Sequence, residues 1–166
     1  MTPARLLATV GGVGLLRPAP GTWGSLAALP LAWALHVFGG WIALIAGIAV
    51  LLPLGAWAIG RLDGGDPDPS EAVIDEVAGQ WIALLPVSYG ALFAQADVLA
   101  LWPGWVAAFA AFRLFDIWKP GPVGRLDRMH TPWGVMLDDV AAGAMAALTV
   151  IALAIFWHVA VLGAAS

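Results

Sequence analysis

Acidic side chains gather at three places in this 166-residue chain, each beside an apolar stretch. Like charges so close to apolar residues are unfavourable unless a cation or a shared proton relieves them. Carboxylate oxygens suit Mg²⁺ or Mn²⁺, whereas zinc would prefer His or Cys. The pattern therefore favours metal-assisted phosphoryl transfer. The acids concerned are Glu71, Asp75, Glu76, Asp116, Asp138 and Asp139.

Two cations accompany the middle acid. Arg113, Asp116 and Lys119 recur at three-residue spacing, so a helix would place them on one face, and Pro120 would end that helix. Two cations around one carboxylate suit a phosphate held beside a metal-binding acid. An ordinary ion pair at a helix end explains the same spacing equally well.

A Pro-Gly segment that begins at Arg17 leads into an apolar stretch, with Thr22 or Ser25 available as the helix N-cap. Its glycines would let backbone N–H groups approach an anion at the positive end of that helix. The simpler alternative, a loop followed by a capped helix, is favoured by the spacing alone.

The other two acidic segments carry further helix signals. Glu71 and Asp75 are four residues apart, so a helix through both would present them on one face. Gly79 and Gly143 would permit close approach of another helix. The alternative explanation is that the helix dipole favours acids at a helix N-terminus. This accounts for one aspartate of the Asp138–Asp139 pair, but less well for two adjacent ones.

Five apolar stretches must position these side chains. A bilayer-spanning helix needs about 20 residues, a length that the second, fourth and fifth stretches reach, whereas the first is short and contains Pro30. We therefore expect an all-α membrane bundle of about four to five apolar helices, forming a single domain over residues 1–166. The stretches are Ser25–Phe38, Trp41–Ile59, Val77–Phe93, Val98–Phe115 and Val140–Leu162.

Charge placement indicates orientation. If all five stretches cross, all seven basic residues and ten of the eleven acids lie on one side, and Asp97 alone lies on the other. Because Lys/Arg bias sets topology, the charged side should be cytoplasmic, with the site at that interface. Tryptophans near that side, Trp81 among them, are expected as interfacial anchors. The N-terminal arm does not read as a signal peptide, so we expect it in the mature protein.

Composition excludes several classes of function. A hydrophobic content of 61% and a mean hydropathy of +0.89 favour a membrane protein over a soluble domain. The net charge of -4 argues against a nucleic-acid partner, and the lack of cysteine excludes a cysteine nucleophile. His36, His130 and His158 have no patterned partners. Nothing in the sequence indicates an oligomeric state.

Four strings, in order and at similar separations, resemble the phosphatidylglycerophosphatase A family from Arg17 to about Gly143. One departure is His130-Thr131-Pro132-Trp133, where the family often has further glycines before Gly134. The matching strings are RPAPGTWGSLAALPL, DPSEAVIDEVAGQWIALL, FRLFDIWKPGP and GVMLDDVAAG.

The resemblance implies a Mg²⁺-dependent phosphatase (Mn²⁺ being the alternative ion) that converts phosphatidylglycerol phosphate to phosphatidylglycerol in the bacterial inner membrane, on the pathway to cardiolipin. Glu76 is the candidate for orienting the attacking water. The catalytic set that it implies is Asp75, Glu76, Asp116, Asp138 and Asp139. The expected metal ligands are Asp75, Asp138, Asp139 and Glu71. The expected phosphate-binding residues are Arg113, Lys119, Thr22 and Ser25.

A small cation transporter or channel subunit is the alternative from a different class, with the acids as an ion site. Such a protein should place acids near the bilayer midplane. Here the acids stand at the ends of the apolar stretches. A CDP-alcohol phosphotransferase is a weaker competitor, because its spaced Asp-Gly-Ala-Arg signature does not follow Asp63.

Overall fold

The computed structural model describes residues 1–62 and 69–162, and within them every regular element is helical. Asp66 and Asp68, for which the sequence favours a solvated acidic loop, lie outside the described residues. In chain order the elements are α1 (Pro3–Ala8), η1 (Val13–Leu15), α2 (Pro20–Ile59), α3 (Ile74–Ala94), η2 (Val98–Leu101), α4 (Trp102–Trp118), α5 (Pro122–Asp127), α6 (Pro132–Trp157) and η3 (His158–Leu162).

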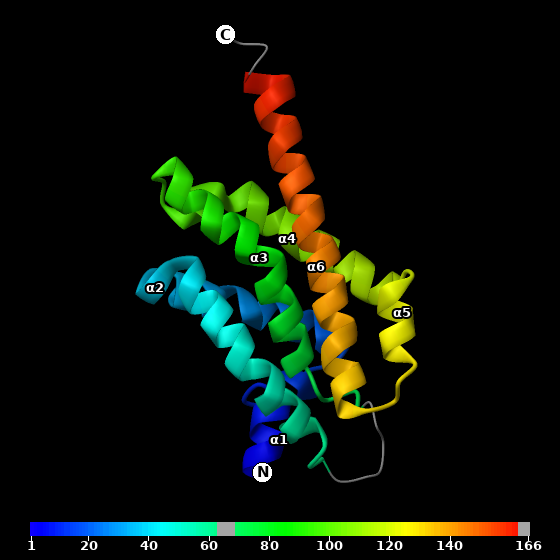
Figure 1. Ribbon diagram of the computed structural model, residues 1–166. Helices are drawn as coiled ribbons and strands as arrows, with labels where there is room; N and C mark the ends of the chain where they lie inside the picture. Colours follow the sequence, from blue (N-terminus) through cyan, green and yellow to red (C-terminus); the bar gives the residue numbers. More distant parts are fainter. Residues whose placement is uncertain (63–68, 163–166) are drawn as a thin grey trace.

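Helix α2 is a hairpin of two helical arms, which correspond to the first two apolar stretches of the sequence. The backbone leaves helical geometry at Gly39 and Gly40, and Gly40 has a φ of 61°. A residue without a Cβ adopts this left-handed conformation readily. The chain therefore turns back on itself there, as the blue and cyan arms in Figure 1 show.

Four helices of the described chain are long and apolar enough to cross a membrane. They are Pro20–Ile59, Ile74–Ala94, Val98–Trp118 and Pro132–Ala160. The predicted all-α membrane fold is thus confirmed, with the first two apolar stretches joined in α2. The N-terminus and the starts of α3 and α6 lie near one end of the molecule, and the C-terminus lies at the other (Figure 1).

Helices α3 and α6 meet through glycine. A Cβ on Gly79 would lie 2.7 Å from the Asp139 carbonyl oxygen and 2.4 Å from the Phe112 ring, and a Cβ on Gly143 would lie 2.4 Å from the Gly79 carbonyl oxygen. Only bare backbones fit at that spacing. The predicted close approach at Gly79 and Gly143 is confirmed, and it brings Asp139 of α6 beside the first turns of α3.

Helix α3 also packs against both arms of α2. Trp81 is 7% exposed, and its indole N–H donates to the carbonyl oxygen of Ala28 at 3.0 Å. In the other arm, a Cβ on Gly47 would lie 2.9 Å from the Trp81 ring. The prediction of Trp81 as an interfacial anchor is therefore wrong: its ring fills the core between the two arms, and its polar atom is satisfied there.

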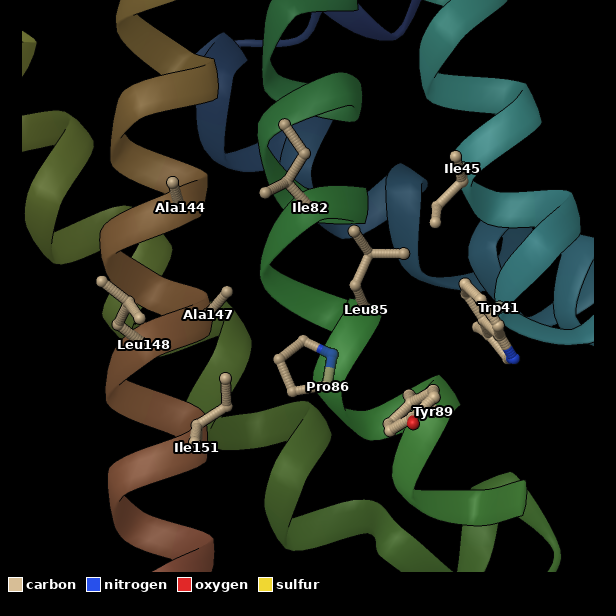
Figure 2. A pocket seen from close by; sticks show the side chains of 10 residues that line it. All are labelled: Trp41, Ile45, Ile82, Leu85, Pro86, Tyr89, Ala144, Ala147, Leu148 and Ile151. Carbon is tan, nitrogen blue, oxygen red and sulfur yellow. The ribbon is translucent and has the colours of Figure 1, made fainter. Parts of the chain in front are cut away.

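An apolar groove of about 480 Å³ opens on the surface between the second arm of α2, α3 and α6 (Figure 2). Trp41 and Tyr89 stack edge to face in its wall, with ring centroids 5.4 Å apart. Pro86, Leu148 and Ile151 face the same hollow. Such a lining suits a surface that faces hydrocarbon rather than water.

Candidate active site

Three carboxylates from three helices converge on one arginine. Glu76 comes from the first turn of α3, Asp116 from the last turns of α4, and Asp139 from the second turn of α6. Each offers one oxygen, and these oxygens all lie within 4.8 Å of one another. Together with Arg113 and Ser25 we call this group the inner cluster. Glu76 and Asp139 are buried and Asp116 is half-buried.

Arg113 ties the inner cluster together through a single nitrogen. Its Nη1 lies 2.5 Å from Oε2 of Glu76 and 2.8 Å from Oδ2 of Asp116. The same nitrogen donates to Oγ of Ser25 at 3.3 Å. Hydrogen bonds between a guanidinium and carboxylates are charge-assisted, and they are strong when the side chains are largely buried. The predicted sharing of one helix face is confirmed for Arg113 and Asp116 but is wrong for Lys119, which lies at the C-cap of α4.

Ser25 reaches the cluster from α2. Its Oγ lies 3.0 Å from Oε2 of Glu76 and 2.9 Å from the Gly21 carbonyl oxygen, so its one proton can go to either acceptor. The helix begins at Pro20 with Ala19 as its N-cap, so Thr22 and Ser25 lie inside it. The prediction that one of them caps the helix is wrong, because Pro20 already supplies the first helical residue.

Gly21 lets the start of α2 touch the Glu76 carboxylate. A Cβ at this position would lie 2.0 Å from Oε1 of Glu76 and 3.3 Å from Nη1 of Arg113. Any side chain there would collide with the carboxylate. Gly21 thus brings the backbone of α2 against a carboxylate, while the approach of its N–H groups to a bound anion stays a prediction.

A second charged group lies beside the first. Lys119 Nζ pairs with Asp127 of α5 and lies 2.9 Å from Oδ2 of Asp138 in α6. We call these three residues the outer cluster. Lys119 is the C-cap of α4, with φ at 49° in the left-handed region, so it leaves the helix face that carries Arg113 and Asp116. Pro120 follows it, as expected for a residue that ends the helix.

The charge of Lys119 is held by its partners. Partial burial lowers the pKa of its ammonium group, but the hydrogen bonds and negative charges of Asp127 and Asp138 outweigh burial, and the pKa lies above its ordinary value. The positive charge of Lys119 is therefore stabilised by its two partners. Sequence reasoning missed Asp127, since its place in the short helix α5 showed no spacing relation to the other acids.

Of the four expected metal ligands, only Asp139 belongs to the inner cluster. Glu71 precedes α3, which begins at Ile74, and its Oε2 lies 2.7 Å from Nη2 of Arg5 in α1. The prediction of one helix carrying Glu71 and Asp75 on the same face is therefore wrong, and Glu71 lies outside the inner cluster. Asp75 is buried next to Glu76 in the first turn of α3.

The inner cluster is able to accept a cation. It has three carboxylates and one arginine, so acids exceed cations by two. Oδ2 of Asp139 is buried and has no hydrogen-bond partner among the described residues. A buried carboxylate oxygen without a partner is costly. The donor set is oxygen only, which fits Mg²⁺ or Mn²⁺.

Comparison with known proteins adds independent information. A family model described as Phosphatidylglycerophosphatase A matches residues 6–154. The chain is 36% identical over 149 residues to "Phosphatidylglycerophosphatase A" of Escherichia coli, covering 87% of this chain and 80% of that protein. It is 35% identical over 156 residues to the protein of the same name in Haemophilus influenzae, covering 92% and 90% of the two chains.

A third relative has a different name. The chain is 39% identical over 144 residues to "Putative phosphatidylinositol-3-phosphatase" of Bacteroides thetaiotaomicron, covering 83% of this chain and 85% of that protein. No solved structure matches the chain. The matched region, residues 6–154, includes every residue of both charged clusters.

Proposed function

Because the chain belongs to the phosphatidylglycerophosphatase A family, we propose that it removes the terminal phosphate of phosphatidylglycerol phosphate, leaving phosphatidylglycerol and inorganic phosphate. The observation that carries this proposal is the convergence of Glu76, Asp116 and Asp139 around Arg113. The reaction would supply phosphatidylglycerol for phospholipid synthesis, including that of cardiolipin.

We propose that Glu76, Asp116 and Asp139 hold a Mg²⁺ ion, for which Mn²⁺ can substitute. The bound ion would supply charge for the phosphate oxygens in the transition state. This set shares Asp139 with the ligands expected from the sequence and replaces Asp75, Asp138 and Glu71 with Glu76 and Asp116. It is supported by the 4.8 Å grouping of their oxygens and by the unpaired Oδ2 of Asp139.

The protein's own cations would recognise the phosphate. Arg113 bridges two carboxylates through Nη1, so its remaining donors can turn toward a phosphate oxygen. Lys119 adds a fixed positive charge beside Asp138. Two routes of attack suit this set: water oriented by Glu76, or an aspartate oxygen whose phosphoryl group water then removes.

A lipid substrate would reach these groups at the end of the bundle where α3 begins and α4 ends. We propose that this end faces the cytoplasm of a bacterial cell and that the inner membrane holds the chain. The support is the collection of all seven basic residues on one side of the predicted spans. Cysteines placed at Arg125 and Gln95 should be labelled from opposite sides of the membrane, Arg125 from the cytoplasm.

The test of the function is phosphate release by the purified protein. We expect turnover of phosphatidylglycerol phosphate that stops with chelator and returns with Mg²⁺. Phosphatidylinositol 3-phosphate belongs in the same assay, because a relative at 39% identity carries the name of a phosphatase for it. Faster turnover of the inositol lipid would replace the proposed substrate, and activity toward neither lipid would reject the proposal.

A further inference from the structure

Gln80 is a fully buried polar side chain in α3. Both its amide atoms, Oε1 and Nε2, are enclosed and have no hydrogen-bond partner among the residues that the structure describes. By contrast, the hydroxyl groups of Thr9, Ser25 and Ser88, which are also buried, each have at least one hydrogen-bond partner. Buried amides are nearly always hydrogen-bonded, because an unsatisfied one destabilises the fold. Within the part of the chain that the structure describes, Gln80 therefore has no protein partner, and a buried water is the simplest group that could satisfy it.

The register of α3 places Gln80 one turn further along the helix than Glu76 of the inner cluster. It follows Glu76 by four residues and so lies on the same helix face, one turn deeper. Helical side chains lean toward the N-terminus of their helix, which carries the Gln80 amide back toward Glu76. The residues on either side of Gln80 contact two different helices: Gly79 meets Phe112 of α4, and Trp81 meets Ala28 of α2. Gln80 therefore faces the region between α4 and α2.

Arg113 presents the matching unpaired donor. Its Nη1 contacts Glu76, Asp116 and Ser25, but its Nε is buried and has no partner among the described residues. Helix α4 runs antiparallel to α3, since Gly104 meets Val87 while Arg113 meets Glu76. Side chains on α4 therefore lean away from the helix end at Trp118 and toward the level of Gln80.

We propose that one buried water molecule links the Gln80 amide to Nε of Arg113, and that Gln80 is thereby a positioning residue for the inner cluster. The water accepts the Nε proton and donates to Oε1 of Gln80, and a second buried water would accept from Nε2 of Gln80. The guanidinium plane is then held at two edges, at Nη1 by the carboxylates and at Nε by the water. Its effect on catalysis rests on the proposed function, whereas the link itself does not.

The link can be read directly from arginine side chains. The chain has six arginines, so ¹⁵N labelling of arginine in detergent-solubilised protein gives six Nε–H signals, of which the one lost in Arg113→Lys belongs to Arg113. We expect Gln80→Met to shift that signal and speed its exchange with solvent, while the other five stay in place. Ser88→Ala, a buried polar change two turns deeper in α3, should leave it unmoved. An Arg113 signal unaffected by Gln80→Met would overturn the proposal.

Turnover provides the second readout. Gln80→Met should lower kcat about tenfold with little change in KM, since one contact that orients a charged group is lost. Gln80→Leu should do the same if methionine packs poorly, and Ser88→Ala should keep full activity. Full activity in both Gln80 variants, with a raised Tm, would mark the amide as an unused buried group and overturn the positioning role. Absence of wild-type turnover would instead reject the proposed function and leave the ¹⁵N result to decide the link.

Discussion

Asp138 and Asp139 are neighbours in the chain, yet they belong to two different charged clusters. Asp138 pairs with Lys119, which also binds Asp127. Asp139 joins Glu76 and Asp116, and one of its oxygens has no partner among the described groups. Consecutive residues of a helix point about 100° apart, which is why one step along α6 changes cluster.

The two clusters differ in charge balance and in burial. In the outer cluster two acids share one lysine, and Lys119 and Asp127 are about one third exposed. In the inner cluster three acids share one arginine, and the side chains of Arg113, Glu76 and Asp116 are less than 15% exposed. Excess charge is costly where water is excluded. The inner cluster is therefore the one with the larger unbalanced charge and the deeper burial, which a bound cation or a shared proton would relieve.

The largest effect should come from Asp139→Asn. It removes a charge from the cluster in which acids exceed cations by two, and we expect turnover to fall about 1000-fold or more. Asp138→Asn should cost far less, because Asp127 still holds Lys119. The assay is phosphate release by equal amounts of purified variants with matched Tm. Asp97→Asn, which keeps an N-cap at the start of η2, is the control for loss of charge. Equal losses of turnover in Asp138→Asn and Asp139→Asn would show that the two clusters do not differ in function.

The next effect concerns Gly21, where a Cβ would lie 2.0 Å from Oε1 of Glu76. Gly21→Ala should push that carboxylate or the start of α2 aside. Displacing a reacting group by about 1 Å costs roughly a hundredfold in rate, and we expect a loss of that size in kcat. Gly90→Ala is a matched control, since a Cβ there meets nothing within 4 Å. Similar kcat values for the two variants would show that the contact between Gly21 and Glu76 is unimportant.

Lys119→Ala tests the outer cluster. One lost contact to a phosphate is worth roughly 1.5–3 kcal/mol, so turnover should fall between about tenfold and a hundredfold. Removing this cation also leaves Asp127 and Asp138 facing each other without a shared partner, so Tm should fall as well. The rate and Tm are measured on the same samples. Unchanged turnover would make the outer cluster purely structural.

Much of this arrangement follows from the sequence, because local patterns carry it. The apolar stretches predicted the spanning helices, Pro120 predicted the end of α4, and Gly79 and Gly143 predicted the tight crossing of α3 and α6. One acid from each of the three acidic segments also meets the others in the inner cluster. The local patterns depend on residues near one another in the chain.

Contacts between segments that are distant in the chain could not be predicted from the sequence. Glu71 pairs with Arg5, 66 positions away, and no local pattern links them. Asp127 pairs with Lys119 only because the chain reverses through α5. Trp81 is a residue type common in interfacial anchors, but its side chain points between the arms of α2. Which acids meet in the inner cluster was likewise set by helix packing rather than by spacing.

The smallest effect should come from Glu71→Gln. Glu71 and Arg5 form a partly exposed pair, with 23% and 46% of their side chains exposed, and such pairs contribute at most about 1 kcal/mol. We expect less than about a twofold change in turnover, measured beside Asp139→Asn. A loss comparable to that of Asp139→Asn would return Glu71 to the metal site that the sequence suggested.

The most direct measurement is Mn²⁺ binding to the purified protein, followed by electron paramagnetic resonance as Mg²⁺ is added in competition. The inner cluster predicts binding that Mg²⁺ displaces, that Asp138→Asn retains and that Asp139→Asn loses. Failure of the wild-type protein to bind Mn²⁺, or equal binding by Asp139→Asn, would contradict the proposal that Glu76, Asp116 and Asp139 hold the metal.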